Sequence, residues 1–436
     1  MKKARICLLG LVLFCSACAA PSLRYKKEVN SLIAAGKFNE AEQRVVSKKN
    51  KLYSRKDATL FYLDRAILLH DAGDASQSDQ LFAAGQANID ELYAKSVSAS
   101  LGRFLINDLT TPYYAPAYEQ ALTYYYRALN FLQTGDVSSA AVEARRAVFF
   151  LDHLRAEKKK GYNDDPFVQY FASLVFESVG QLSDARIART NAFNAYARLG
   201  AALRVSSPDF PVPANAARLG EIIVIHSNGL MPLKKSDTLQ VAWDRAVLLA
   251  STAQEGENVS PEVQNAVYAG LAGNAVTLSF PSFERQPYRV AISALEAGGQ
   301  TFYTQKVADF AAAARLDLEE KMPGILFRTA TRAVVKEAAA VQARHAAAQA
   351  AKDDTVGELA GMFVSALGAA VEKADTRQWF TLPAEVRMAR AFVPPGEQNI
   401  RLLLRDGYGN IVGERVFENV RVQRGGRVFL HVRTAY

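Results

Sequence analysis

The strongest hydrophobic pattern in the chain lies between residues 113 and 154, and it predicts two consecutive amphipathic helices. In its first half, apolar side chains recur at steps of three and four residues, namely at Tyr118, Leu122, Tyr125, Leu129 and Leu132. Gly135-Asp136 interrupts the pattern as a turn would. Apolar residues then resume at the same spacing, namely at Ala140, Ala144, Ala147, Leu151 and Leu154. The two halves form a helical hairpin whose apolar face must be covered by neighbouring units.

Four such turns share the pattern glycine, any residue, apolar, two of any kind, then a small residue. They begin at Gly36, Gly73, Gly135 and Gly180, with spacings of 37, 62 and 45 residues. The pattern resembles the inter-helix turn of tetratricopeptide repeats, whose standard length is about 34 residues. The longer spacings predict an extra helix around residues 89–105 and a charged loop at 155–166. The alternative is an irregular helical bundle without repeat geometry.

Three prolines between residues 205 and 219 mark a change of pattern. Runs rich in β-branched residues then predict strands at 221–226, 275–280, 288–294, 379–382, 386–391, 399–405, 411–417 and 427–433. Residues 306–350 and 356–374 are predicted to be helical, with a break in the first at Met322-Pro323-Gly324. We expect an α+β multidomain chain: a TPR-like helical domain at 24–204, a proline-rich linker at 205–220, and a mixed α+β domain at 221–436. That last domain is expected to end in a small antiparallel sheet or sandwich.

Residues 1–17 have the layout of a secretory signal peptide, with a basic start, a short apolar run and small residues at the end. Cys15-Ser16-Ala17-Cys18 follows and resembles the lipobox of bacterial lipoproteins, although Cys15 stands where leucine is usual. The resemblance implies cleavage before Cys18, lipidation of Cys18 (with palmitate among its acyl chains), and a short lipidated tether at 18–23. Ala19 follows in place of aspartate, which favours the periplasmic face of the outer membrane over the inner membrane.

The charge and the cysteines exclude several classes of function. The net charge of +8 falls to +5 without the three basic residues of the leader, and no dense basic patch carries interleaved aromatics, so we expect no nucleic-acid partner. All three cysteines lie within the first 18 residues, so the remaining chain has no disulfide and no cysteine nucleophile.

No catalytic motif appears in the sequence. The chain has no Gly-x-Ser-x-Gly elbow, no phosphate loop and no dinucleotide-binding glycine fingerprint. The five histidines are far apart and no two have i,i+4 spacing, at His70, His153, His226, His345 and His431. We therefore expect no enzyme activity, no cofactor and no metal ion.

Candidate partner-binding or structural residues come from three places, each of which has a structural alternative in salt bridges or a solvated face. The first is the central hairpin, with Tyr118, Tyr125, Glu143, Arg145 and Arg146. The second is a basic stripe at helical spacing that comprises Arg328, Arg332 and Lys336. The third is a predicted junction between helix and strand, with Asp375, Arg377 and Trp379.

Several blocks of the chain resemble an uncharacterised family of Gram-negative envelope lipoproteins with tetratricopeptide-like repeats. The similar blocks are residues 112–146, Asn228-Gly229-Leu230 with Lys234-Lys235, Phe280-Pro281, residues 374–379 and Pro395-Gly396. The resemblance implies no catalytic residues, and relatives often accompany lipoproteins that activate peptidoglycan synthases.

These features predict a lipoprotein anchored in the outer membrane and facing the periplasm, which acts as a protein-binding scaffold or assembly factor. The concave face of the helices is expected to hold a protein partner in the envelope, with the peptidoglycan-synthesis machinery as the indicated pathway. The alternatives are an envelope hydrolase that uses two carboxylates as acid and base, and a structural subunit of a larger envelope complex.

Overall fold

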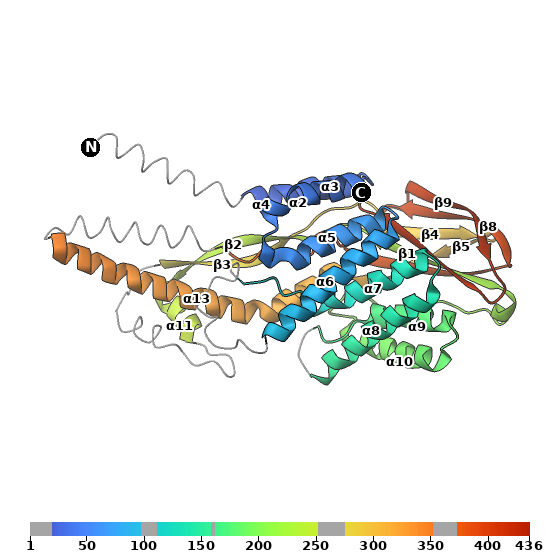
Figure 1. Ribbon diagram of the computed structural model, residues 1–436, viewed down its shortest axis with the longest axis horizontal. Helices are drawn as coiled ribbons and strands as arrows, with labels where there is room; N and C mark the ends of the chain where they lie inside the picture. Colours follow the sequence, from blue (N-terminus) through green and yellow to red (C-terminus); the bar gives the residue numbers. More distant parts are fainter. Residues whose placement is uncertain (1–19, 97–110, 158–161, 252–274, 352–372) are drawn as a thin grey trace.

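The computed structural model describes residues 20–96, 111–157, 162–251, 275–351 and 373–436 (Figure 1). Within these ranges, an N-terminal helical region is followed by three β-sheets and a long helix, so the chain is a mixed α+β protein. The predicted leader and Cys18 lie outside the described residues.

The helical region consists of consecutive helical hairpins. The paired helices are α2 (Ala20–Ala34) with α3 (Phe38–Ser47), α5 (Ala58–Asp71) with α6 (Ala75–Ser96), α7 (Ala117–Gln133) with α8 (Val137–Ala156), and α9 (Pro166–Ser178) with α10 (Leu182–Leu199). Shorter turns of helix lie in the connections, namely α4 (Lys49–Leu52), η1 (Arg55–Asp57) and η3 (Ala216–Arg218). The helix expected around residues 89–105 is not a separate element where it is described, because residues 89–96 continue α6. Residues 97–105 lie outside the described part.

The four glycine turns have the predicted form. Each glycine has a left-handed backbone, with φ of +72° at Gly36, +88° at Gly73, +80° at Gly135 and +73° at Gly180. In every turn, the N–H of the residue after the glycine bonds back to a carbonyl five residues earlier, which is the Schellman pattern that ends a helix. The small residue five positions after each glycine is buried, at Ala41, Ser78, Ala140 and Ala185.

The strands form two four-stranded sheets and a two-stranded ribbon. The first sheet has the order β10-β1-β7-β6, formed by Arg427–Thr434, Gly220–Asn228, Glu385–Val393 and Gln305–Asp309. The second has the order β5-β4-β8-β9, formed by Gln300–Tyr303, Ile292–Ala297, Gly396–Arg405 and Ile411–Val422. The ribbon pairs β2 (Leu233–Ala242) with β3 (Ala275–Glu284). Strands β2, β5 and β6 were not predicted.

The first sheet is the middle layer of three. Because side chains alternate along a strand, Ile223 and Ile225 of β1 join the core shared with the helices, whereas Ile222 and Val224 join a second core against the other sheet. The two sheets therefore pack face to face, as the sandwich prediction requires. The second sheet is antiparallel throughout, as predicted, whereas the last strand, β10, pairs in parallel with β1 in the first sheet.

A third, smaller core lies away from the sheets, where α11 (Trp243–Ser251) and α13 (Phe310–Ala351) pack on the ribbon (Figure 1). The predicted break at Pro323 is wrong, because α13 runs continuously through this residue. Pro323 is exposed, so the carbonyl that it leaves without a partner can be solvated and the helix tolerates it. The predicted helix at 356–374 lies outside the described residues apart from its last two, which have no regular structure.

Residues 374–384, called the crossing segment below, run across the first helices of the hairpins and form no strand, so the predicted strand at 379–382 is wrong. Trp379 is fully buried, and its ring lies 5.8 Å from that of Phe82 and 6.0 Å from that of Tyr126. The hydroxyl of Thr381 donates to Asp64 Oδ1 at 2.7 Å. The inner face of the helices is therefore covered by the protein's own chain.

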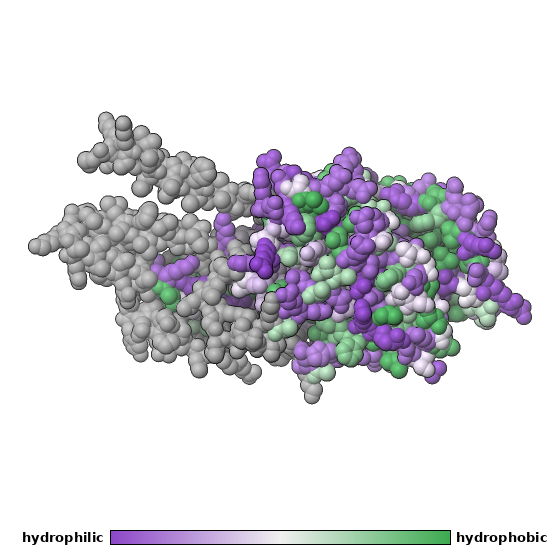
Figure 2. All heavy atoms as spheres, viewed as in Figure 1, coloured by the Kyte–Doolittle hydropathy of each residue, from purple (hydrophilic) through white to green (hydrophobic). Residues whose placement is uncertain are grey.

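The outer surface of the helices is different in character. On the face shown in Figure 2, hydrophilic side chains predominate over the described helices, with smaller hydrophobic patches between them. Phe149 of α8 is the most exposed phenylalanine of this region, at 76%.

Candidate functional site

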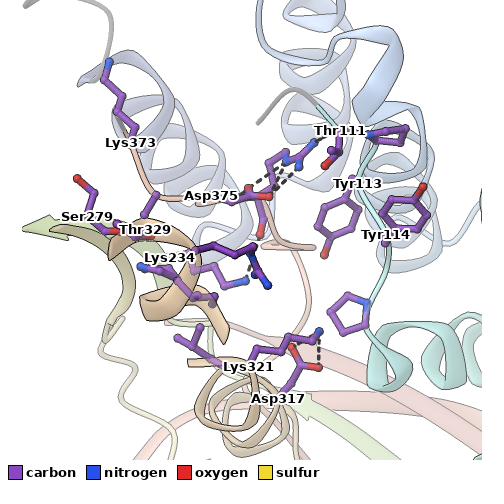
Figure 3. Close-up of a pocket in the computed structure, with 18 of the residues that line it drawn as sticks. Thr111, Tyr113, Tyr114, Lys234, Ser279, Asp317, Lys321, Thr329, Lys373 and Asp375 are labelled. Carbon is purple, nitrogen blue, oxygen red and sulfur yellow. Dashed lines mark hydrogen bonds and ion pairs between the residues drawn. The ribbon is translucent and has the colours of Figure 1, made fainter. Parts of the chain in front are cut away.

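A cleft of about 270 Å³ lies where the helical region, the ribbon and α13 meet (Figure 3). Its walls come from residues 111–116 before α7, from Lys234 of β2, from the first half of α13 and from residues 373–377. Figure 3 shows Tyr113 and Tyr114 on one side, with Lys234, Ser279 and Thr329 on the opposite side. The cleft therefore draws together segments that are up to 266 residues apart in the sequence, as in the bond from Arg377 to Thr111.

The cleft is positively charged. Six basic and two acidic side chains line it, an excess of four positive charges. Both acidic groups are paired, Asp317 with Lys321 at 2.7 Å and Asp375 with Arg377 at 2.7 Å. Burial would raise the pKa of Asp375, but the hydrogen bonds and charge of Arg377 outweigh it and hold that pKa below its ordinary value. Among the side chains that line the cleft, basic groups therefore outnumber acidic ones.

Arg377 holds one wall of the cleft in place. Its Nη1 donates to Asp57 Oδ1 at 3.1 Å and to the carbonyl of Thr111 at 2.9 Å. Its guanidinium also lies 5.8 Å from the ring centre of Tyr113. A planar guanidinium suits such multiple contacts, which fasten the start of the crossing segment to the helical region.

Lys234 of β2 is a half-buried cation that lines the cleft. Burial lowers its pKa, although Asp375, Asp317 and Glu119 act in the opposite direction. Within the described part of the chain, its Nζ makes one long hydrogen bond, of 3.4 Å, to the carbonyl of Arg377. An ammonium group has three donors, so this one has donors to spare for an anionic ligand or for water.

A buried carboxylate supports the wall from behind. Glu119 of α7 accepts hydrogen bonds from Tyr113 at 2.7 Å, from Tyr118 at 3.0 Å and from the backbone N–H of Trp379 at 3.2 Å. Burial raises the pKa of Glu119, and these hydrogen bonds act against that rise. Tyr118 does not line the cleft. It helps to position Glu119, and Glu119 in turn binds the backbone of the crossing segment.

The structure brings two of the three predicted groups of residues together. Arg328 and Arg332 from α13 line the same cleft as Asp375 and Arg377, although nearly 50 residues separate the groups in the sequence. Trp379 lies deeper and packs the crossing segment against the helices.

The central hairpin contributes elsewhere. Tyr125 is a buried core residue, and buried Glu143 pairs with Arg127 at 3.1 Å and with Arg146 at 2.8 Å. Arg145 pairs with Asp184 at 3.1 Å on the outer surface. Arg145 and Arg146 line a separate surface groove beside α6, away from the cleft.

Sequence reasoning missed Lys234, Lys321 and Glu119 as site residues. Lys234 and Lys235 are neighbours in a strand. Because successive side chains of a strand point to opposite faces, the two lysines cannot both face the same side of the ribbon. That alternation is the available signal. The position of Glu119 on the buried face of a helix gives a second one.

Among the described helices, none has both the length and the hydrophobicity needed to cross a membrane. No protein-family model, curated protein or solved structure is significantly similar to the chain.

Proposed function

We propose that this protein is a non-enzymatic lipoprotein of the cell envelope, anchored through Cys18 at the periplasmic face of the outer membrane. It acts as a scaffold or assembly factor that holds a partner protein, and an acidic segment of that partner binds in the cleft. The leader and Cys15-Ser16-Ala17-Cys18 support the anchor. Lys234, a half-buried ammonium that lines the cleft with donors to spare, is the observation that carries the binding role.

The size and walls of the cleft favour a short acidic peptide. A volume of about 270 Å³ is at the lower end for ligand pockets and accommodates one or two side chains rather than a long glycan. Basic residues attract carboxylates, and the rings of Tyr113 and Tyr114 offer apolar surface to the neighbouring part of the peptide. The resemblance to envelope lipoproteins favours the peptidoglycan-synthesis machinery as the source of the partner.

We also infer that the hairpins are tetratricopeptide-like. Four identical glycine turns, each followed by a buried small residue, support repetition of one unit. The crossing segment covers the inner face of these hairpins, so that face offers little room to a partner. The cleft beside the segment, together with the outer surface, is then the place for partner contacts.

An envelope hydrolase is the less supported alternative. Glycoside hydrolysis uses one carboxyl group kept protonated as an acid and a second that acts as base or nucleophile. The two carboxylates of the cleft, Asp317 and Asp375, are both ion-paired, and the lowered pKa of Asp375 keeps it ionised. This arrangement suits charge balance better than proton transfer.

In-cell photo-crosslinking tests the binding role. A photoreactive amino acid replaces Ile325, which lines the cleft, and in a separate strain it replaces Tyr408, which is 94% exposed on a distant hairpin turn. We expect the Ile325 probe alone to capture a partner peptide rich in Asp and Glu, identified by mass spectrometry of the crosslinked segment.

Two neighbouring lysines provide a matched pair of variants. Lys234→Met removes the cation of the cleft, whereas Lys235→Met removes one from the same strand whose partner is Asp237, at 2.8 Å. Crosslinking should fall at least several-fold in the first variant and remain in the second. Equal loss in both, or capture of segments without acidic residues, would contradict the proposal.

A further inference from the structure

Three side chains from distant parts of the sequence meet between the helical region and the first sheet, at the end of α5 and on β10. These residues, His70, Asp71 and His431, are called the histidine–aspartate cluster below. Nε2 of His70 lies 3.2 Å from Nδ1 of His431, and one carboxylate oxygen of Asp71 lies within 4.8 Å of both nitrogens. His70 is buried, His431 is half-buried, and the side chain of Asp71 is only 2% exposed.

Hydrogen bonds determine which nitrogen of His70 carries its proton. The hydroxyl of Ser78 donates to the carbonyl of Ala66 at 2.7 Å, so it can only accept from Asn130 Nδ2, at 2.9 Å. Asn130 therefore turns its Oδ1 to His70 Nδ1, at 2.6 Å, and this nitrogen must be the donor. The Nε2 of neutral His70 then presents its lone pair towards His431.

The second ring nitrogen of His431, Nε2, also has a partner, because it lies 3.0 Å from the hydroxyl of Ser227. When that nitrogen donates to Ser227, the Nδ1 of His431 presents a second lone pair to that of His70. In this tautomer the two lone pairs face each other across 3.2 Å, and a cation between the rings would be held by both. In the other tautomer, His431 donates from Nδ1 to His70, whose Nε2 also lies 3.5 Å from the amide nitrogen of Gln133.

Asp71 is the third candidate ligand. Neither of its oxygens accepts a well-formed hydrogen bond from the described residues, although Arg433 Nε lies 3.3 Å away as an ion pair. The Nη1 of Arg433 is directed elsewhere, to the carbonyls of Gly229 and Thr434 at 2.7 and 2.6 Å. The ion pair with Arg433 balances the charge of Asp71, and the carboxylate oxygens keep unused acceptor capacity that a metal ion can take up.

We propose that the histidine–aspartate cluster binds a zinc ion. Zinc lies about 2.0–2.1 Å from histidine nitrogens in tetrahedral sites, which places two such nitrogens about 3.3–3.4 Å apart. The observed 3.2 Å is close to that separation. A turn of the Asp71 side chain brings an oxygen to the third position, and the fourth is left for water. Imidazole nitrogens select zinc over magnesium or calcium, which prefer oxygen ligands.

The surrounding contacts are those of a metal site. Ligating histidines usually bond through their other nitrogen to a neighbouring group, as His70 does to Asn130 and His431 to Ser227. Arg433 remains beside Asp71 and orients its second oxygen. The ion would join residues 361 positions apart in the sequence and fasten the helical region to the sheet, so its role is structural.

Zinc content and thermal stability test the proposal on the full chain, purified in detergent without an affinity tag. The protein is stripped with EDTA, reloaded with zinc sulfate, dialysed and measured by inductively coupled plasma mass spectrometry. We expect about one zinc ion per chain and a melting temperature that rises with zinc.

Two variants each remove one nitrogen that would bind zinc, Nε2 of His70 or Nδ1 of His431. Each keeps the hydrogen bond made by the other nitrogen of that ring. In His70→Asn, the amide nitrogen can still donate to Asn130, and in His431→Gln it can still donate to Ser227. Both should lose zinc and the zinc-dependent stabilisation. The control is His226→Gln, a buried histidine of the same sheet that bonds Ser293 and Thr434 and should keep its zinc.

Wild-type protein that takes up no zinc after reloading would overturn the proposal, whatever the variants do. Zinc bound equally by wild type, His70→Asn and His431→Gln would overturn it as well, since the metal would then lie elsewhere.

Discussion

Replacement of Trp379 by alanine tests whether the crossing segment holds the helical hairpins to the sheets. The indole is fully buried between Phe82 and Tyr126, while its backbone N–H donates to Glu119, a bond that alanine retains. The variant therefore removes the packing of the indole and its Nε1 donor, and it keeps the backbone bond. Truncation of a buried tryptophan to alanine costs about 3–5 kcal/mol, a large share of the roughly 5–15 kcal/mol that stabilises a typical domain.

A phenylalanine at the same position separates packing from polar effects. The Nε1 of Trp379 has no hydrogen-bond partner within the described part of the chain, so Trp379→Phe removes a buried donor that is unsatisfied there. The phenyl ring also leaves a smaller cavity than alanine does. We expect Trp379→Phe to cost about 1–2 kcal/mol, less than the about 3–5 kcal/mol of alanine.

The assay is urea unfolding of the full chain, followed by far-ultraviolet circular dichroism and fitted for the midpoint and slope. Phe149→Ala is the control, because this side chain is 76% exposed and its loss should change the free energy of unfolding by less than about 0.5 kcal/mol. If Trp379→Ala lowered the free energy of unfolding no more than Phe149→Ala, the packing of Trp379 would not hold the helical hairpins to the sheets.

Three further predictions concern the anchor, the turns and a buried acid. Cys18→Ala should release the protein from the membrane fraction and abolish labelling by a palmitate analogue; equal labelling of wild type and variant would contradict the lipobox assignment. Gly135→Ala should lower stability by about 1–2 kcal/mol in thermal unfolding, because φ is +80° although nothing lies within 4 Å of the added Cβ. Gly407→Ala, equally unobstructed but without the positive φ, should be neutral. Burial raises the pKa of Asp64 from 3.8 to about 7, so between those values the folded chain keeps a proton that the unfolded chain has lost. The free energy of unfolding of the wild type should therefore fall as pH rises through that window, by on the order of 1 kcal/mol per pH unit, relative to that of Asp64→Asn, which cannot titrate at this position. A difference between the two proteins that does not change with pH would refute the raised pKa.

The local features of the fold could be predicted because short-range rules determine them. A glycine between two periodic runs has few structural uses other than a left-handed turn, and Gly36, Gly73, Gly135 and Gly180 all adopt one. The strand at 221–226 was equally clear, since β-branched residues on both faces indicate burial on both sides.

The crossing segment could not be predicted, because its conformation depends on distant partners. The apolar residues at 379–382 have the composition of a strand, yet the N–H of Trp379 bonds to the Glu119 side chain and not to a neighbouring strand. The same limit applies to Pro323, where exposure decides that the helix continues. It applies most strongly to His70 and His431, which meet only because α5 packs on the first sheet. Their spacing in the sequence contains no metal-binding signal.

The position of the cleft has a consequence for any ligand that binds there. Arg377 ties the start of the crossing segment to Asp57 and Thr111 of the helical region, while Lys234 belongs to the ribbon and Asp317 to α13. A ligand in contact with all of these walls bridges the helical region, the ribbon and α13. Because a ligand that binds only the assembled form stabilises it by mass action, occupation of the cleft must oppose separation of the ribbon and α13 from the helices. Occupation of the cleft by any ligand and the attachment of the crossing segment are thus linked through the same few side chains.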